Sequence, residues 1–274
     1  MSEIFLLTIA LIGGFAAGIY DLKTSNVPDK LCLAMIAIGL IIHIYTGVIT
    51  GDFTNFINSL LFGGLFLVFG LGMYYTGQWG GGDGELLVTF GILLPNLSIV
   101  NTYFPFSISF FINSFFVGAA YSIIYSAFMM YKIPKMRRKF TKQFESNRIR
   151  LIIFSFFVVS ALFLLSSRMF FFWISITIVI LIIFQKFAKS VEQGFLIRIP
   201  VSKLKPDDTI GQDIPELGIY KKLIRGLTKN EVRKIKRRRK HVIIKEGIRY
   251  GVVFPLSVVF TLLFGDFIFF FFSF

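Results

Sequence analysis

Several apolar segments, each about as long as a bilayer is thick, constrain the fold of this chain more than any other feature. A helix needs about 20 apolar residues to cross the hydrocarbon layer, and slightly shorter segments also suffice. The segments of suitable length are residues 4–20, 31–50, 55–76, 84–101, 107–131, 151–167, 169–187 and 248–273. The sequence therefore predicts an all-α polytopic membrane protein with about eight transmembrane helices. Six to nine are compatible with the pattern, because the fourth segment carries Glu85 and Pro95 and the sixth and seventh adjoin at Arg168.

The composition agrees with a membrane protein and excludes several kinds of site. Hydrophobic residues make up 55% of the chain and 36 residues are Phe, whereas a soluble domain is roughly half apolar even when glycine is counted. The single cysteine, Cys32, excludes disulfides within the chain and Cys-rich metal sites. The two histidines, His43 and His241, lie too far apart in sequence to indicate a metal centre. We expect no metal and no cofactor.

Basic residues alternate between the connections that join the apolar segments. The odd-numbered connections are residues 21–30, the glycine stretch before Asp83, residues 132–150 and the segment after Lys186, and all but the glycine stretch carry lysines and arginines. The even-numbered connections hold only Arg168. Cytoplasmic loops of membrane proteins concentrate Lys and Arg. The pattern predicts a multi-pass protein of the plasma membrane with its N-terminus outside and the ends that carry Asp21 and Asp83 in the cytoplasm. The first segment follows Glu3 rather than a positive region, so we expect a transmembrane helix and not a signal peptide.

The only sizeable polar region lies near the C-terminus. Residues 196–201 read as a short strand, Thr228 and Glu231 form a capping box, and a basic run follows. We therefore expect three parts: a membrane domain over residues 1–187, a basic cytosolic α+β domain over 188–247, and a last transmembrane helix over 248–274. The net charge of +14 favours contact of the basic segments with anionic lipid. Nucleic-acid binding is not expected, because no recognition motif accompanies the charge.

Two acids at predicted cytoplasmic helix ends could form a reactive pair. Asp21 ends the first apolar segment, and Asp83 precedes the fourth. If two carboxylates approach within a few ångströms, they share one proton; one then acts as base toward a water while the other donates to a carbonyl oxygen. Desolvation at the membrane edge should raise the apparent pKa values of the pair. Such a pair would hydrolyse a peptide bond without a metal.

The glycines before Asp83 have a possible role in the same chemistry. Gly80, Gly81 and Gly82 lack a Cβ, so we expect them to adopt unusual torsions and to let an extended substrate backbone lie close to Asp83. Taken alone, the cluster is equally compatible with a water-exposed turn that carries a capping aspartate. In the first segment, Gly14 and Gly18 form a small-xxx-small pair that predicts a closely packed neighbouring helix.

Two motifs resemble one family of membrane proteases. Residues 21–29, Asp-Leu-Lys-Thr-Ser-Asn-Val-Pro-Asp, resemble the first catalytic-aspartate segment of the type IV prepilin peptidases, and residues 80–83 match their GxGD motif. The resemblance implies an intramembrane aspartyl endopeptidase that removes leader peptides from type IV prepilin-like or preflagellin precursors, with Asp21 and Asp83 as its dyad. It is nearest to the archaeal branch. The paired cysteines of bifunctional bacterial relatives are missing, so no N-methyltransferase activity is expected. The motifs cover only about the first 90 residues.

Two further acids depart from or compete with the family pattern. Glu85 stands where many relatives have a Lys or a small residue; it either disturbs the titration of the dyad or, as we favour, faces water at a helix N-terminus. Asp29 competes with Asp21 for the role of first catalytic acid, but it follows Pro28 at the start of the next helix, a common capping position. Our hypothesis is that Glu85 and Asp29 help to hold the positive residues of a leader peptide.

Two other functions compete with the protease. A transporter or ion channel could bind cations or protons through acids near a broken helix, but it would favour acids at mid-span and a repeat between the two halves. Neither is clear in the sequence. A structural scaffold for pilus assembly would keep its function after both aspartates are replaced. The sequence indicates no oligomeric state.

Overall fold

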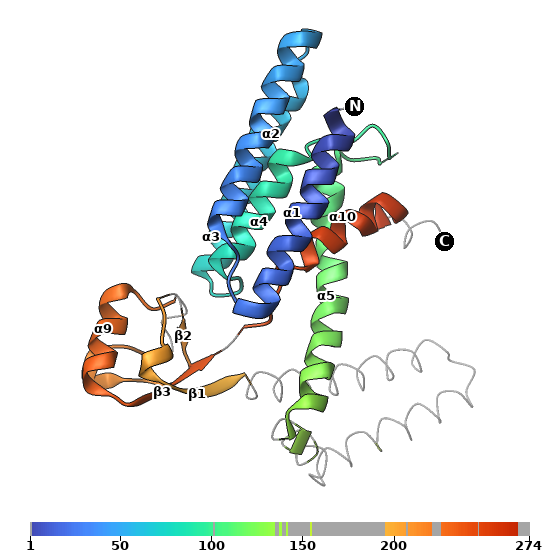
Figure 1. Ribbon diagram of the computed structural model, residues 1–274. Coiled ribbons are helices and arrows are strands. Elements are labelled where there is room, and N and C mark those ends of the chain that lie inside the picture. Colours follow the sequence, from blue (N-terminus) through green and yellow to red (C-terminus); the bar gives the residue numbers. More distant parts are fainter. Residues whose placement is uncertain are drawn as a thin grey trace. The chain divides into compact units, whose positions relative to one another are not determined.

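The chain forms two compact units in a computed structural model. The structure describes residues 2–100, 102–134, 137–138, 141, 154, 195–206, 208–220, 226–245 and 247–267. The first unit comprises Met1–Ile123, Lys221–Thr228 and Gly247–Phe274; the second comprises Ile124–Tyr220 and Lys229–Glu246. Figure 1 colours the chain by residue number, from blue at the N-terminus to red at the C-terminus. The C-terminal residues thus fold with the N-terminal helices, which places two distant parts of the sequence in one unit.

Within the described residues, four helices are long and apolar enough to cross a membrane. They are α1 (Ser2–Thr24), α2 (Asp29–Thr50), α3 (Thr54–Tyr75) and α5 (Phe106–Lys132). Their positions confirm the predicted spans at residues 4–20, 31–50, 55–76 and 107–131. The predicted spans at 151–167 and 169–187 lie outside the described residues, so the expected number of about eight is not reached within the described part of the chain.

The predicted fourth span, residues 84–101, is wrong in its extent. Helix α4 runs from Gly81 to Leu93, which is 13 residues. Leu94 leaves the helical region with φ −126° and ψ 57°, because a residue that precedes proline is disfavoured in the α conformation and Pro95 follows. The apolar composition continues beyond this point, which is why a length criterion alone extended the span.

The predicted last span, residues 248–273, is also shorter in the structure. Helix α10 covers Val253–Phe264, or 12 residues, and residues 247–250 before it are not helical. Gly265 adopts a positive φ of 59° and follows the helix directly. Such a conformation suits glycine and ends the regular helix. Residues 268–274 lie outside the described part.

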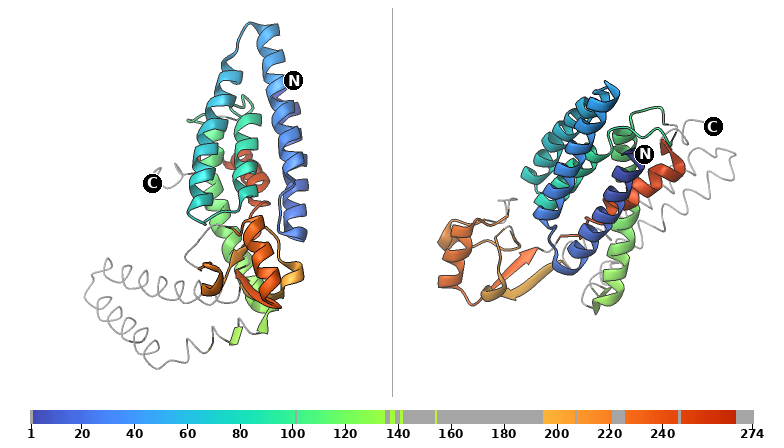
Figure 2. Two further views of the ribbon diagram at one scale, coloured as in Figure 1. Left: turned by 90° about the vertical axis from the view of Figure 1, so that its left-hand side faces the viewer. Right: turned by 45° about the horizontal axis from the view of Figure 1, so that its top comes forward.

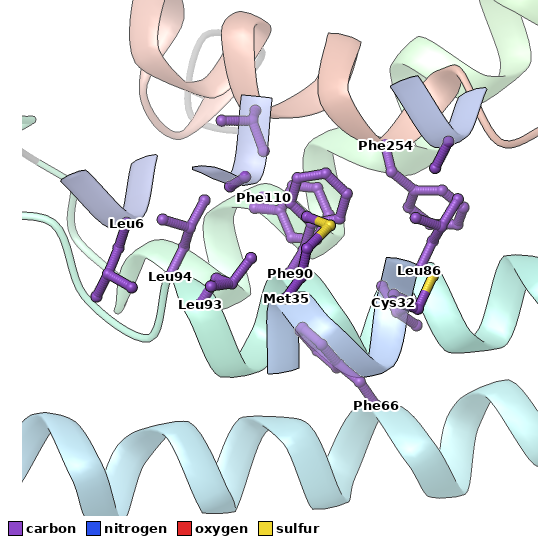
Figure 3. Packing of buried hydrophobic residues seen from close by; sticks show 14 of the residues in the cluster. Leu6, Cys32, Met35, Phe66, Leu86, Phe90, Leu93, Leu94, Phe110 and Phe254 are labelled. Atoms are coloured by element: carbon purple, nitrogen blue, oxygen red, sulfur yellow. The ribbon is translucent and has the colours of Figure 1, made fainter. Parts of the chain in front are cut away.

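Helix α4 lies at the centre of the first unit. It packs against α3, α2, α1 and α10, and the view in Figure 2 places it among them. Seven of its residues are buried, and the core around Leu86, Phe90 and Leu93 includes Phe66 and Phe254 (Figure 3). By contrast, the outer helices α1, α2 and α3 expose many large apolar side chains. A helix that is apolar on all sides suits a position at the centre of a membrane bundle.

Glycines allow several of these close contacts. A Cβ at Gly14 would meet Phe90 and Pro255, and a Cβ at Gly18 would lie 2.7 Å from the Val252 Cα atom. The close approach expected at the small-xxx-small pair is therefore confirmed. These contacts hold the end of α1 against the segment that leads into α10.

The second unit contains an antiparallel three-stranded sheet in the order β1-β3-β2. The strands are β1 (Leu196–Pro200), β2 (Thr209–Ile210) and β3 (His241–Lys245). Two short 3-10 turns, Val201–Lys203 and Pro215–Leu217, accompany them. Helix α9 (Lys229–Arg238) buries Val232 and Ile235, and its last turn is basic. The predicted α+β character and the strand near residue 196 are thus found in this unit.

Candidate active site

Asp21 and Asp83 lie at the same end of the first unit. Helix α1 ends and α4 begins there (Figure 1). The connection after α1 packs on the start of α4, since a Cβ at Gly82 would lie only 2.6 Å from Val27 Cβ. The negative charge of Asp21 acts on Asp83. The two acids found in the sequence are therefore close enough to interact electrostatically.

Asp21 is buried and held by the C-terminal part of the chain. It lies in the last turn of α1 with 7% of its surface exposed. The Gly251 N–H donates a hydrogen bond of 3.0 Å to Asp21 Oδ2. The Arg249 guanidinium donates to the Leu22 carbonyl, and its positive charge acts on Asp21. Burial has the largest effect and disfavours the ionised form of Asp21, while the N–H donor and the nearby cation oppose it.

Asp83 is partly buried and occupies the third position of α4. Its Oδ2 accepts a hydrogen bond of 3.0 Å from the Gly80 N–H, while its own N–H donates to the Gly80 carbonyl at 3.2 Å. Burial, followed by the negative charge of Asp21, raises the pKa of Asp83 to about 7, against the opposing effect of the Gly80 hydrogen bond. The raised pKa favours the protonated form of Asp83.

The surroundings of the two acids differ in a way that separates their roles. Asp21 has an N–H donor and the Arg249 charge beside it, whereas Asp83 has an N–H donor and the unfavourable charge of Asp21. Pairs of carboxylates with unequal environments supply one base and one acid.

The glycines of the GxGD motif do not adopt the unusual torsions that we expected. Gly80 is extended, with φ −71° and ψ 159°, and α4 begins at Gly81. Among the described residues of this loop, the positive φ belongs to Gly77, at 68°. Gly82 is instead required by packing on Val27, where a Cβ would lie 2.6 Å from Val27 Cβ, and Gly84 packs against the backbone of Gly70. The expected unusual torsions are wrong, because Gly80 is extended and Gly81 and Gly82 lie in the first turn of α4. The approach of a substrate backbone to these glycines stays a prediction.

Glu85 and Asp29 lie on the exposed side of the same region. Both side chains are exposed, and their negative charges act on each other. Asp29 is the first residue of α2, and Pro28 occupies the cap position that we expected for Asp29. Asp29 is thus a first-turn acid, which a helix N-terminus also favours. The four acids therefore form two groups: the charge of Asp21 acts on Asp83, and the charge of Asp29 acts on Glu85.

Three residues near the site were missed in the sequence: Arg249, Tyr250 and Gly251. The Tyr250 ring lies 5.9 Å from that of Trp79, which precedes Gly80. Burial, followed by the charge of Asp83, raises the pKa of Tyr250 to about 12, so its hydroxyl stays protonated. The available signal was an Arg-Tyr-Gly sequence directly before an apolar run, which is too common to identify a site.

The site offers carboxylates but no metal-binding cluster within the described residues, where no group of three His, Cys, Asp or Glu side chains could hold an ion. Both acids of the pair lie at helix ends rather than at mid-span. This placement gives no support to the transporter or channel alternative, which favours acids at mid-span.

Comparison with known proteins relates the chain to leader peptidases. Residues 6–123 match the model of the type IV leader peptidase family. A preflagellin peptidase of Methanocaldococcus jannaschii is 36% identical over 93 residues, which cover 33% of this chain and 38% of that protein. A preflagellin peptidase of Methanococcus maripaludis is 26% identical over 156 residues, or 52% of this chain and 67% of that protein. A prepilin peptidase of Methanothermobacter thermautotrophicus is 26% identical over 141 residues, which cover 47% of this chain and 37% of that protein. Two of these three matches therefore span well under half of the relative's length.

Proposed function

We propose that this chain, related to the type IV leader peptidases through residues 6–123, is an intramembrane aspartyl endopeptidase that removes leader peptides from prepilin-like or preflagellin precursors. The observation that supports the proposal is that Asp21 and Asp83 lie at one end of the helical unit, where the negative charge of Asp21 acts on Asp83. Both acids lie within the matched region. The names of the archaeal relatives support the substrate class.

The proposed reaction needs one water and the two aspartates. The Asp21 carboxylate takes a proton from the water, whose oxygen attacks the carbonyl carbon of the scissile peptide bond. Asp83 donates its proton to the carbonyl oxygen, which gives a neutral tetrahedral diol. Asp21 then donates its proton to the amide nitrogen while the Asp83 carboxylate takes a proton from a diol hydroxyl. The C–N bond breaks, the products are a carboxylic acid and an amine, and the pair again holds one proton. The substrate must be unwound at this bond, because helical peptide bonds are shielded from attack.

The substrate is proposed to reach the pair from the cytoplasmic face. The basic loops support this orientation. The exposed acids Glu85 and Asp29 lie on the same region and offer charge that complements a basic leader. We propose that the basic second unit contacts anionic lipid, and we expect neither nucleic-acid binding nor N-methylation. The site residues, the orientation and the lipid contact rest on these arguments from charge and position.

The proposal is tested by incubating the purified protein in detergent with a precursor that carries a basic leader before an apolar helix. We expect the wild type to release the leader, and mass spectrometry should locate one cut. Asp21→Asn and Asp83→Asn should each remove cleavage while leaving the thermal unfolding midpoint near that of the wild type. Asp52→Asn is the matched control, because Asp52 is exposed in the α2–α3 connection. A folded dyad variant that cleaves at the wild-type rate would refute the assignment and leave the scaffold alternative open.

A further inference from the structure

A short segment before α10 contacts Asp21 directly and packs on Trp79 in the loop that leads to Asp83. We define it as the strap, residues 249–252. It follows Gly247 and precedes α10, so it lies more than 120 residues beyond the region that matches the leader peptidase family. Its contacts with α1 and with the loop before α4 are therefore a property of this chain that the family match does not supply.

The strap holds the end of α1 by three contacts. The Gly251 N–H donates to Asp21 Oδ2 at 3.0 Å. The Arg249 guanidinium donates to the Leu22 carbonyl. The backbone of Val252 fills the space over Gly18, where a Cβ would lie 2.7 Å from the Val252 Cα atom. Together these contacts fix the turn that carries Asp21 against the strap.

The strap holds the loop before α4 through Tyr250. The Tyr250 and Trp79 ring centroids lie 5.9 Å apart, and Phe254 packs on both rings at 5.9 and 5.8 Å. The Tyr250 hydroxyl faces the carbonyl of Ser114 at 3.4 Å, over Gly118, which has no side chain to block it. Trp79 immediately precedes Gly80, whose N–H holds Asp83. The aromatic packing thereby connects the strap to the second acid.

We propose that the strap is a positioning element that sets the geometry of the aspartate pair, with the Gly251 N–H and the Arg249 guanidinium acting on Asp21 and the Tyr250 ring supporting the Asp83 loop. This inference rests on the proposed function. The charge effects run from Arg249 on the strap to Asp21, from Asp21 to Asp83 on α4, and from Asp83 to Tyr250 on the strap.

The first test compares two glycines that flank Arg249. Gly251→Ala places a Cβ 3.1 Å from Asp21 Oδ2 and 3.4 Å from its Cγ, whereas Gly247→Ala meets nothing within 4 Å. Since displacement of a reacting group by about 1 Å reduces rates by up to about a hundredfold, we expect Gly251→Ala to lower kcat/KM for precursor cleavage at least about tenfold. Gly247→Ala should stay within about twofold of the wild type.

The second part of the test uses pH, which a purely structural effect would not move. Arg249→Gln removes the positive charge near Asp21, so ionisation of the aspartate pair becomes harder and the acid limb of the kcat/KM profile should move to higher pH by about one unit. Arg249→Lys keeps the positive charge, so the acid limb of its kcat/KM profile should stay at the wild-type pH.

The outcomes separate this inference from the proposed function. If the two glycine variants are equally active, or if the acid limb is unchanged in Arg249→Gln, the positioning role of the strap is rejected. The proposed function still holds in that case, provided that the wild type cleaves the precursor. A wild type that fails to cleave refutes the proposed function instead. If Gly251→Ala does not fold, the two Arg249 variants decide the question alone.

Discussion

At the scale of single residues, the chemistry depends on how each carboxylate is surrounded. Asp21 and Asp83 have the same side chain, yet one receives the Gly251 N–H beside a cation and the other faces a neighbouring negative charge. The motif residues could be predicted from sequence because the Asp segment and GxGD are local patterns. The Gly251 contact could not, since it joins residues 230 positions apart and involves a backbone group that leaves no mark in composition.

Glu85 and Asp29 provide a prediction at this scale. Replacing both as Glu85→Gln and Asp29→Asn should raise KM for a precursor with a basic leader by about two- to fivefold, since exposed ion pairs contribute about 0.2–1 kcal/mol. The increase should shrink at high salt, because salt screens exposed charges. Steady-state kinetics with basic and neutralised leaders measure the effect, with Asp52→Asn as control. Equal KM values for both leaders in wild type and variant would remove these acids from leader binding.

At the scale of elements, glycine contacts determine where α4 can lie. The backbones of α3 and α4 meet at Gly70 and Gly84, one residue beyond Asp83. Hydrophobic length predicted the outer helices well, because each presents lipid-facing apolar residues along about 20 positions. It failed for α4, since Pro95 ends the helix while the apolar sequence continues. Pro95 already made the fourth segment an uncertain span in the sequence, but the apolar residues on both sides of it do not show where the helix ends.

Two glycines of α3 form a matched pair for testing this packing. A Cβ at Gly70 would lie 3.0 Å from the Gly84 Cα atom, whereas one at Gly72 meets nothing within 4 Å. Because backbone atoms cannot move aside as a side chain can, Gly70→Ala should destabilise the fold by about 1–3 kcal/mol. Gly72→Ala should be neutral or slightly stabilising, as alanine is the better helix former. Unfolding midpoints in detergent measure both, and equal midpoints would contradict the assigned contact.

At the scale of the whole molecule, the site depends on the chain returning to its first helices. Residues 247–267 belong to the same unit as α1 and α4, although the sequence suggested only a last transmembrane helix there. The α+β character of the second unit was predictable from local strand and capping signals. The outside N-terminus and the cytoplasmic position of the pair stay predictions that rest on loop charge.

The pH dependence of cleavage tests the central claim, a proton-sharing aspartate pair, most directly. Single-turnover rates should be measured from about pH 4 to pH 9, the interval in which a perturbed carboxyl pair titrates. Asp83 must be protonated to donate, and its pKa is raised to about 7. The account therefore predicts a bell-shaped profile whose rate falls as pH rises through about 7. A rate that stays constant or increases between about pH 6 and pH 9, with the protein folded throughout, would contradict Asp83 as the proton donor.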